Sequence, residues 1–532
     1  MENSSSAARR VFFATLLITL TFRTVLAARL PITGDEAYFY FWGRYPAFGF
    51  YDHPPMVGWW LAALRQISDH PLMLRLPALL APVFIAWLAR RMLRPRGEEL
   101  AWQAATVMLL LPLNAWNVAI TTDVPLMVFG FATVAWYLRA LRTGRAVDFV
   151  LCGLLLGGAL LSKYFAGLLA LAIAGHLLWR PQWRSGTARL RALALVIAGA
   201  LPQAVAQAYW NSQHCWPNVM FNLVNRHDTA GWSLKTPSLY LVSVVYLLTP
   251  LVLWGLLRHW RARPARDGGA AGGHGDRQAH AGVAADERRS DALQASALRW
   301  LVGLPFGVFA LLSAVKRIGL HWLATFTAPA VLLFFHHADA GQRRAALRFA
   351  AGFALAHYLL IIGMAAVPLQ WFARLSSYPG LVMTLAPQAL NDALAPWRGR
   401  FAIASDGYSA AVTLGFNLGE YVFVFGPGSS HARHDDMLTD LRALEGRDIL
   451  IVRKEADRGQ DDERYFERIE RKVIEVRGVR FHLTEGHGFR YPVYRDVVLE
   501  EIRRRWYQVP AWLPSGPCYF CDRYFPERAC HR

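Results

Sequence analysis

Long blocks of apolar residues, separated by short polar and arginine-rich segments, dominate residues 1–370 of the chain. A soluble protein distributes its apolar residues in periodic stripes, whereas these blocks approach the ~20 residues that a helix needs to cross a bilayer. The pattern therefore predicts a polytopic α-helical membrane protein with about eleven transmembrane helices. We expect them at roughly 11–30, 71–90, 101–119, 123–141, 147–163, 165–179, 191–210, 238–257, 297–314, 320–336 and 346–367.

The arginines between these blocks predict the orientation of the chain. They fall in alternate loops, around residues 90–96, 139–145, 180–189, 258–289 and 343–348. Loops rich in Lys and Arg stay in the cytoplasm, so the intervening segments face outward. The first of these is an outer loop at 31–70, and an odd number of spans also places the C-terminus outside. We therefore expect a bacterial inner membrane protein whose outer loops and C-terminal part are periplasmic.

Two segments of the membrane part have a distinct composition. Arg9 and Arg10 precede an apolar run that ends near Ala27 and Ala28, as in a cleavable signal peptide, but the run continues to Leu30 and favours a retained first span. Cleavage remains the alternative. The segment 262–295 combines glycine pairs with mixed charge and predicts a flexible cytoplasmic loop.

The pattern changes near residue 385. Short apolar runs at 401–405, 421–425 and 449–452 are typical of buried strands, and residues 435–444 predict a helix between them. The segment 385–532 is therefore expected to form a small soluble α/β domain on the periplasmic side.

Composition and charge agree with the membrane interpretation. The chain is 54% hydrophobic and 18% charged, and its mean hydropathy is +0.22. In a soluble protein the net charge of +19 would suggest nucleic acid. Here the arginines lie in cytoplasmic loops, so we expect no nucleic-acid partner.

The five cysteines do not predict a disulfide scaffold. Cys518-x-x-Cys521, followed by Cys530-His531, has a spacing that also occurs in zinc sites. Outside the membrane, an oxidised Cys518–Cys521 pair or free thiols are the alternatives.

Acidic residues gather in the predicted outer segments. Asp35 and Glu36 are adjacent in the first outer loop, and Asp52 and His53 follow among aromatic residues. Such groups suit general-base catalysis or metal ligation, although Thr33 followed by Glu36 also fits a helix N-terminal capping box. Asp123 lies where two predicted spans meet; it could cap the next helix, but an ionisable group near a span is a functional candidate.

Basic residues occur on the same side. Lys163 lies in an outer turn, and Lys316, Arg317 and His321 form a cluster where the positive-inside rule leaves few basic residues. Lys163 could simply extend toward the membrane surface. Together with the carboxylates, these cations indicate a site for an anionic lipid donor and a hydroxyl acceptor.

In their order, these motifs resemble the C-type glycosyltransferases. The matching residues are Asp35-Glu36-Ala37-Tyr38, Tyr51-Asp52-His53-Pro54-Pro55, Thr122-Asp123-Val124-Pro125, Ser162-Lys163-Tyr164 and His321-Trp322. That superfamily contains the dolichyl-phosphate-mannose protein mannosyltransferases and the lipid A aminoarabinose transferase. The bacterial branch with an Asp-His-Pro-Pro block is the most similar, and the C-terminal domain is similar to the tails of that branch.

The resemblance implies a site and an activity. It implies that Asp35 is the catalytic carboxylate and that Asp123 supports it, with Glu36 beside them. Asp52 and His53 occupy the place of a Glu-Lys pair in the aminoarabinose enzyme, where the carboxylate helps to hold a metal and the lysine meets the carrier phosphate. Asp52 and His53 are therefore candidate ligands of a divalent metal ion. The donor phosphate is expected between Lys163, Lys316, Arg317, His53 and His321.

The expected function is transfer of a sugar from a polyprenyl-phosphate donor to a hydroxyl acceptor at the periplasmic face, with inversion. The acceptor would be an envelope lipid, a glycan or a protein, and the lipid bilayer is the other partner. Two alternatives remain: a transporter or flippase for a lipid-linked sugar, and a membrane-anchored binding or assembly protein. A transporter would place its charges at the bilayer midplane on broken helices, whereas here they lie at span ends and in loops.

Overall fold

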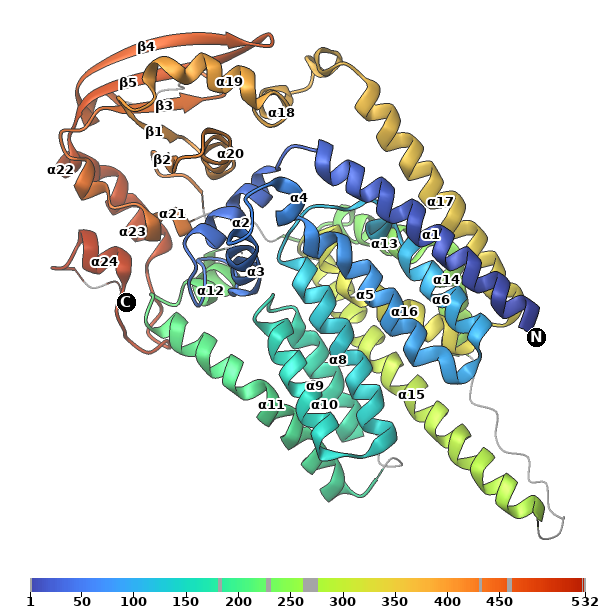
Figure 1. Ribbon diagram of the computed structural model, residues 1–532. Coiled ribbons are helices and arrows are strands. Elements are labelled where there is room, and N and C mark those ends of the chain that lie inside the picture. Colours follow the sequence, from blue (N-terminus) through green and yellow to red (C-terminus); the bar gives the residue numbers. More distant parts are fainter. Residues whose placement is uncertain are drawn as a thin grey trace.

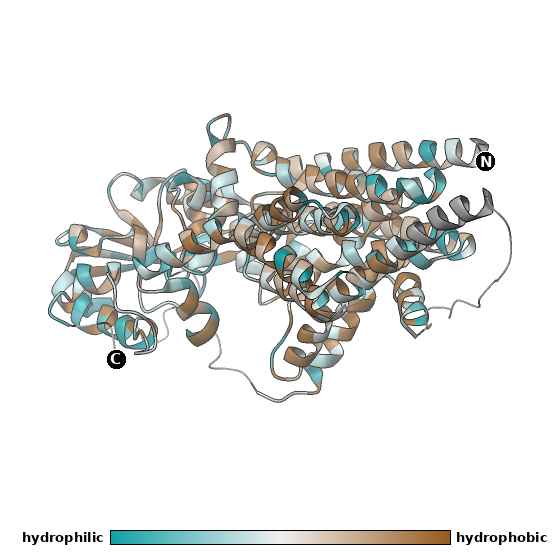
Figure 2. Cartoon of the chain, turned by 90° about the horizontal axis from the view of Figure 1, so that it is seen from below, coloured by the Kyte–Doolittle hydropathy of each residue, from teal (hydrophilic) through white to brown (hydrophobic). Residues whose placement is uncertain are grey.

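The computed structural model describes residues 2–179, 184–225, 231–261, 276–429, 433–456, 462–528 and 530. The N-terminal part forms a helical bundle, and the C-terminal part forms an α/β domain at one end of it (Figure 1). Figure 2 shows hydrophobic residues spread along the bundle helices, while hydrophilic residues gather in the half that holds the C-terminus.

Every predicted span coincides with a helix or with a closely spaced pair of helices. The bundle helices are α1 (Glu2–Arg29), α4 (Pro71–Leu74), α5 (Leu76–Leu93), α6 (Glu98–Leu110), α7 (Pro112–Trp116), α8 (Asp123–Thr143), α9 (Ala146–Leu160), α10 (Ala166–Trp179), α11 (Gly186–Ser212), α13 (Lys235–Leu248), α14 (Pro250–Arg261), α15 (Asp276–Ser313), α16 (Ala324–His337) and α17 (Ala340–Ala366).

The described part of the chain contains 6 helical segments that are long and apolar enough to cross a membrane, and one bent pair could make a seventh. They are Ser4–Arg29, Pro71–Arg96, Asp123–Thr143, Gly186–Ser212, Ser290–Ser313 and Ala340–Ala366. Helices α9, α10, α6 and α16 are apolar but shorter. A membrane protein is therefore confirmed, and eleven spans remain a prediction.

Two segments of the bundle differ from expectation. The predicted span 238–257 is divided into α13 and α14, which bend by 100° at Thr249, whose φ of 62° lies in the left-handed region, before Pro250 begins the next helix. The chain is helical from Asp276, inside the predicted flexible loop 262–295, since alanines favour helix there. Residues 262–275 lie outside the described residues.

The C-terminal domain is built on a five-stranded sheet with the order β2-β1-β3-β5-β4. Its strands are β1 (Ala402–Ser405), β2 (Phe423–Val424), β3 (Ile449–Arg453), β4 (Phe466–Val476) and β5 (Val479–Phe489). Strand β1 pairs in parallel with β2 and β3, with Ala404 opposite Phe423 and Ile451. The β4–β5 hairpin adds to β3 in the antiparallel direction, with Ile451 opposite Thr484.

Both faces of this sheet are covered, because successive residues of a strand point to opposite sides. Leu450 and Val452 of β3 pack under α18 (Tyr378–Leu385), α19 (Pro387–Leu394) and α20 (Tyr408–Leu418). Ile449 and Ile451 face a second core formed with α23 (Glu500–Trp506) and α24 (Tyr519–Tyr524). That second core also contains Tyr51 and Phe221 from predicted outer segments of the membrane part. The two parts of the molecule therefore share one core.

The predicted strands are confirmed within two residues, and the predicted helix 435–444 is shorter than expected. It is divided into α21 (His434–Leu438) and a turn of 3-10 helix (Leu441–Leu444). The hairpin was not predicted, because charged residues interrupt the apolar positions of β4.

The predicted outer segments of the membrane part fold into short helices between the bundle and the α/β domain (Figure 1). They are α2 (Gly34–Arg44) and α3 (Met56–Arg65) in the first outer loop, and α12 (Pro217–Val219) after α11. Disulfides join Cys215, just before α12, to Cys518, and Cys521 to Cys530. The alternative of a Cys518–Cys521 bond is therefore wrong, since Cys518 pairs with a residue 303 positions away.

Candidate active site

A cavity of about 440 Å³ lies where the bundle, the first outer loop and the C-terminal domain meet. It is lined by helix ends and turns far apart in the sequence. Its charged or titratable lining residues are Arg23, Asp35, Tyr38, Asp52, His53, Asp123, Lys163, His321 and Tyr408. The structure therefore brings together six of the residues that the sequence identified, from four separate segments.

The N-terminus of α2 places Asp35 at this cavity. Thr33 is the N-cap, and its hydroxyl accepts a hydrogen bond from the backbone N–H of Glu36, while the Glu36 carboxylate accepts one from the backbone N–H of Thr33. This is the capping box that the sequence suggested. It uses Glu36 and leaves Asp35 exposed at the cavity wall.

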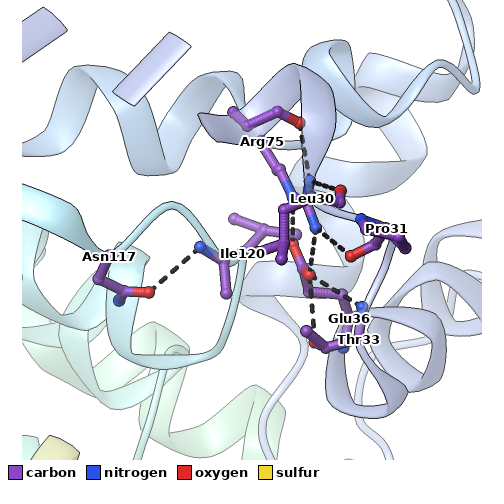
Figure 3. A network of polar contacts seen from close by, with 9 residues as sticks. Leu30, Pro31, Thr33, Glu36, Arg75, Asn117 and Ile120 are labelled. Carbon is purple, nitrogen blue, oxygen red and sulfur yellow. Dashed lines mark hydrogen bonds and ion pairs between the residues drawn. The ribbon is translucent and has the colours of Figure 1, made fainter. Parts of the chain in front are cut away.

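Glu36 does not line the cavity and belongs instead to a buried polar network (Figure 3). Arg75 holds both of its oxygens, with Nε donating to Oε1 at 2.8 Å and Nη2 donating to Oε2 at 2.7 Å. The backbone N–H of Ile120 donates to the same carboxylate at 3.1 Å. The side chains of Arg75 and Glu36 are 0% and 1% exposed. The geometry gives Glu36 an anchoring position and leaves Asp35 as the carboxylate of the pair that reaches the cavity.

Asp52 and His53 form a second polar group at the cavity. His53 Nδ1 lies 3.2 Å from Asp52 Oδ2, and the Tyr38 hydroxyl donates to Asp52 Oδ1 at 3.2 Å. Burial raises the pKa of the Asp52 carboxyl, but the charge and the hydrogen bond of His53 outweigh that effect, and its pKa is lowered. Asp52 is therefore held as a carboxylate.

The Asp35 carboxyl has the opposite tendency. Its pKa is raised, first because the surrounding protein desolvates the carboxylate and then because Asp52 is negatively charged nearby. His53 and Lys163 oppose this rise without cancelling it. Two neighbouring carboxyl groups thus have pKa values shifted in opposite directions, which is how a site separates a proton acceptor from a fixed charge.

Asp123 and Lys163 form an ion pair in the wall of the cavity. Asp123 is the first residue of α8, and Lys163 lies in the turn after α9. Their side chains, each 10% exposed, form an ion pair of 2.8 Å between Nζ and Oδ1. Both residues line the cavity, so a ligand there would meet this pair rather than two independent charges.

Of the remaining predicted cations, only His321 lines the cavity in the described part of the chain. His321 is exposed and lines the cavity beside Trp322, in a turn of 3-10 helix (Leu320–Trp322). Lys316 and Arg317 lie in the preceding turn after α15, and neither belongs to the cavity lining formed by the described residues.

The Asp52–His53 pair does not fit a metal ion as it stands. A catalytic zinc site has three protein ligands, and Asp52 and His53 contact each other while Asp52 also accepts the Tyr38 hydroxyl. Among the described residues, a cluster of three or more potential ligands occurs at Cys518, Cys521 and Cys530 alone, and their sulfurs are in disulfides.

Two of the charged or titratable lining residues escaped the sequence interpretation. Arg23 of α1 reaches the cavity wall, where Nη1 donates to the Leu79 carbonyl at 3.0 Å and Nη2 donates to the Asn117 carbonyl at 2.9 Å. An arginine inside an apolar span is costly, and that signal could have identified it. Tyr408, at the start of α20, had no such signal.

The helical bundle, the α/β domain and the charged cavity between them resemble the C-type membrane glycosyltransferases. The family described as dolichyl-phosphate-mannose-protein mannosyltransferase matches residues 52–210. The lipid A galacturonosyltransferase RgtD of Rhizobium johnstonii is 28% identical over 248 residues, which are 43% of this chain. The resemblance to the bacterial C-type glycosyltransferases is thus confirmed.

Solved structures show the same fold. ArnT from Cupriavidus metallidurans bound to undecaprenyl phosphate is similar with a TM-score of 0.57 and 13% identity, covering 89% of this chain and 97% of that one. Its apo form gives a TM-score of 0.55 at 13% identity, covering 90% of this chain and 98% of that one. The match to RgtD spans 50% of that relative's length.

Proposed function

We propose that this protein transfers a sugar from a polyprenyl-phosphate donor to a hydroxyl acceptor at the periplasmic face of the inner membrane. The observation that carries the proposal is the cavity, which gathers Asp35 with cationic side chains at the end of a membrane bundle. Apart from Arg23 of α1, its charged side chains lie at helix ends and in turns, as a transferase site at the membrane surface requires. A transporter would carry them at the bilayer midplane.

An apolar groove beside the cavity suits the lipid part of such a donor. It measures about 700 Å³ and runs between α9, α10, α11 and α15. Phe165 lines this groove, and its ring centroid lies 4.8 Å from that of Trp322, which lines the cavity. A polyprenyl chain in the groove would therefore bring its phosphate to the end of the cavity near Lys163.

The phosphate is the leaving group of the proposed reaction, and cations around it would stabilise its developing charge. Lys163, His53 and His321 line the cavity. We retain Lys316 and Arg317 as candidates at the rim, since they lie directly before the His321 turn.

Asp35 is proposed as the general base. It would accept the proton of the acceptor hydroxyl as that oxygen forms a bond to the anomeric carbon and the bond to the phosphate oxygen breaks. Attack in line with the leaving phosphate inverts the anomeric centre. A carboxylate with a raised pKa is a better proton acceptor than an ordinary one.

The likeness to RgtD makes galacturonic acid on a polyprenyl phosphate the first donor to test, with lipid A as the first acceptor. Other sugars, and a glycan or protein hydroxyl, remain candidates. Mass spectrometry of envelope lipids and glycans, with and without the gene, would identify the product.

The test of the proposal is Asp35→Asn in purified, detergent-solubilised protein. Turnover of the labelled donor should fall by about 10²- to 10⁴-fold, the usual contribution of a general base. Binding of undecaprenyl phosphate, measured by native mass spectrometry, should be retained. Asp69→Asn is the matched control, because this carboxylate lies in the same outer loop, is 52% exposed and pairs with Arg65.

In detergent there are no two compartments for a transporter to connect. Consumption of the donor by the solubilised protein therefore distinguishes a transferase from a transporter. Full activity in folded Asp35→Asn would remove Asp35 from the mechanism. A wild-type protein that consumes no polyprenyl-phosphate sugar from a full panel of donors and acceptors would remove the proposed function.

A further inference from the structure

The C-terminal domain contributes a side chain to the cavity. Tyr408, the first residue of α20, lines it together with Asp35 although 373 positions separate them (408 − 35). The Tyr408 ring is half-buried and lies edge-on to Tyr38, with centroids 5.6 Å apart. Tyr38 in turn donates to Asp52. The phenol of Tyr408 thus lies in the part of the cavity that also holds Asp35 and Asp52.

Close packing of α20 on α2 fixes this position. A Cβ atom added at Gly34, directly before Asp35, would lie 2.5 Å from the hydroxyl of Ser409, directly after Tyr408. Farther along the same two helices, the ring of Tyr40 packs edge-on against Phe416 at 4.9 Å. Glycine at position 34 therefore permits the approach that brings the two helix N-termini together.

We propose that Tyr408 is a positioning residue for Asp35, so that the C-terminal domain completes the catalytic cavity. The Tyr408 hydroxyl would donate a hydrogen bond to one oxygen of the Asp35 carboxylate and direct the other toward the acceptor. This inference rests on the glycosyl transfer proposed above.

The electrostatic surroundings support a donor role. The pKa of Tyr408 is raised to about 12, first by burial and then by the negative charges of Asp35 and Asp52. The phenol therefore keeps its proton at neutral pH, and an ionised carboxylate can only accept. A fixed orientation of the base matters because proton transfer requires hydrogen-bond distance to the acceptor.

The first test removes only the hydroxyl. Tyr408→Phe should lower kcat by about 10- to 100-fold, the usual effect of losing a partner that orients a reacting group, and should leave KM for the donor unchanged. Tyr40→Phe is the matched control. It removes a hydroxyl from the same α2–α20 interface, but Tyr40 does not line the cavity and its hydroxyl contacts Arg65 at 3.5 Å. We expect wild-type kcat for the control.

The second test moves the two helices without changing either proposed partner. Gly34→Ala should lower kcat, because its Cβ collides with the Ser409 hydroxyl. Ser409→Ala removes that oxygen, and the remaining contacts, 3.4 Å to Thr413 Oγ1 and 3.6 Å to the Ser409 Cβ, are ordinary. The double variant Gly34→Ala/Ser409→Ala should therefore recover most of the activity. No recovery in a double variant with the wild-type melting temperature would contradict the packing argument.

The third test needs no substrate and is independent of the proposed reaction. Carbodiimide modifies protonated carboxyl groups, so its pH dependence at Asp35, followed by peptide mass spectrometry, reports the titration of this group. Loss of the phenolic donor should move the midpoint upward by about half to one pH unit. The other groups facing Asp35 are unchanged in Tyr408→Phe: Asp52, Glu36, His53 and Lys163.

The outcomes separate the two proposals. An upward shift in Tyr408→Phe, in a protein that transfers no sugar, would retain the contact and reject the proposed function. An unchanged midpoint together with an unchanged kcat would overturn the role of Tyr408 and leave the proposed function standing.

Discussion

Removal of the Glu36 carboxylate distinguishes an anchor from a catalyst. The carboxylate lies in the same buried network as the Arg75 guanidinium, and it also accepts hydrogen bonds from the backbone of Ile120 and the N-cap Thr33. In Glu36→Ala, the guanidinium keeps three backbone carbonyls but loses its counterion. We therefore expect a large loss of stability.

The magnitude follows from the burial of the pair. Removing one partner of a buried ion pair costs about 3–5 kcal/mol, because the remaining charge stays out of water. Loss of the capping box adds about 1 kcal/mol. Against a typical unfolding free energy of about 5–15 kcal/mol, this is a substantial fraction of the whole. Glu36→Ala/Arg75→Leu, which removes both charges, should recover a large part of the loss.

The assay is thermal unfolding of the purified protein in detergent, followed by size-exclusion chromatography and by turnover per folded molecule. Glu36→Ala should melt well below wild type, and its remaining folded fraction should keep turnover within a few-fold of normal. The reasoning is refuted if Glu36→Gln melts like wild type but loses turnover as severely as Asp35→Asn. That result would return Glu36 to the chemistry.

Three further predictions concern the disulfides and the cavity charges. Cys215→Ser/Cys518→Ser should lower the unfolding free energy by about 2–5 kcal/mol, and a reducing agent should lower the wild-type melting temperature. The double serine variant of the other disulfide, which spans 9 positions, should lose less stability. Equal losses in the two variants would contradict the dependence on loop length. The raised pKa of Asp35 predicts that activity falls as the pH drops through that pKa, since only the carboxylate accepts a proton. The folded protein binds this proton more tightly than the unfolded chain, so the ionised Asp35 destabilises the fold above its unfolded pKa. Asp35→Asn should therefore melt slightly higher than wild type at pH 7, and a lower melting temperature would contradict the desolvation argument. Asp123→Asn should leave the buried Lys163 ammonium without its partner and lower the stability of the fold. Asp123→Asn/Lys163→Met should restore stability but not activity. Full activity in this double variant would exclude both side chains from the site.

The fold was predictable where the signal is local. Apolar blocks gave the position of each bundle helix, and the strands β1 and β3 followed from short apolar runs. The bend between α13 and α14 escaped, because both sides are apolar and the break depends on the backbone of Thr249 before Pro250. The β4–β5 hairpin escaped because its charged residues are tolerated on a partly exposed edge of the sheet.

The candidate site was predictable because charged residues are rare in the predicted outer segments, so that each one there indicates a possible role. Asp35, Asp52 and Lys163 are each unusual in their surroundings, and the structure places all of them at one cavity. Without the resemblance, the local residue pattern could not separate the role of Asp35 from that of Glu36, because both fit the first turn of a helix. Which carboxylate turns inward depends on Arg75, 39 positions away from Glu36.

The position of Asp52 depends on segments that are far apart in the sequence, so it cannot be predicted from local residues. Asn218 donates to the carbonyl of Tyr51 at 2.9 Å, next to Asp52. Just before it, Cys215 and Trp216 have left-handed φ values of 64° and 53°, which non-glycine residues adopt only when their surroundings hold them. The surroundings here are the C-terminal tail, through the bond to Cys518 and a hydrogen bond from Trp216 Nε1 to the Pro514 carbonyl at 2.8 Å. The tail thus supports the residue before Asp52 through Asn218, while α20 packs beside Asp35 at Gly34, and neither contact follows from local sequence.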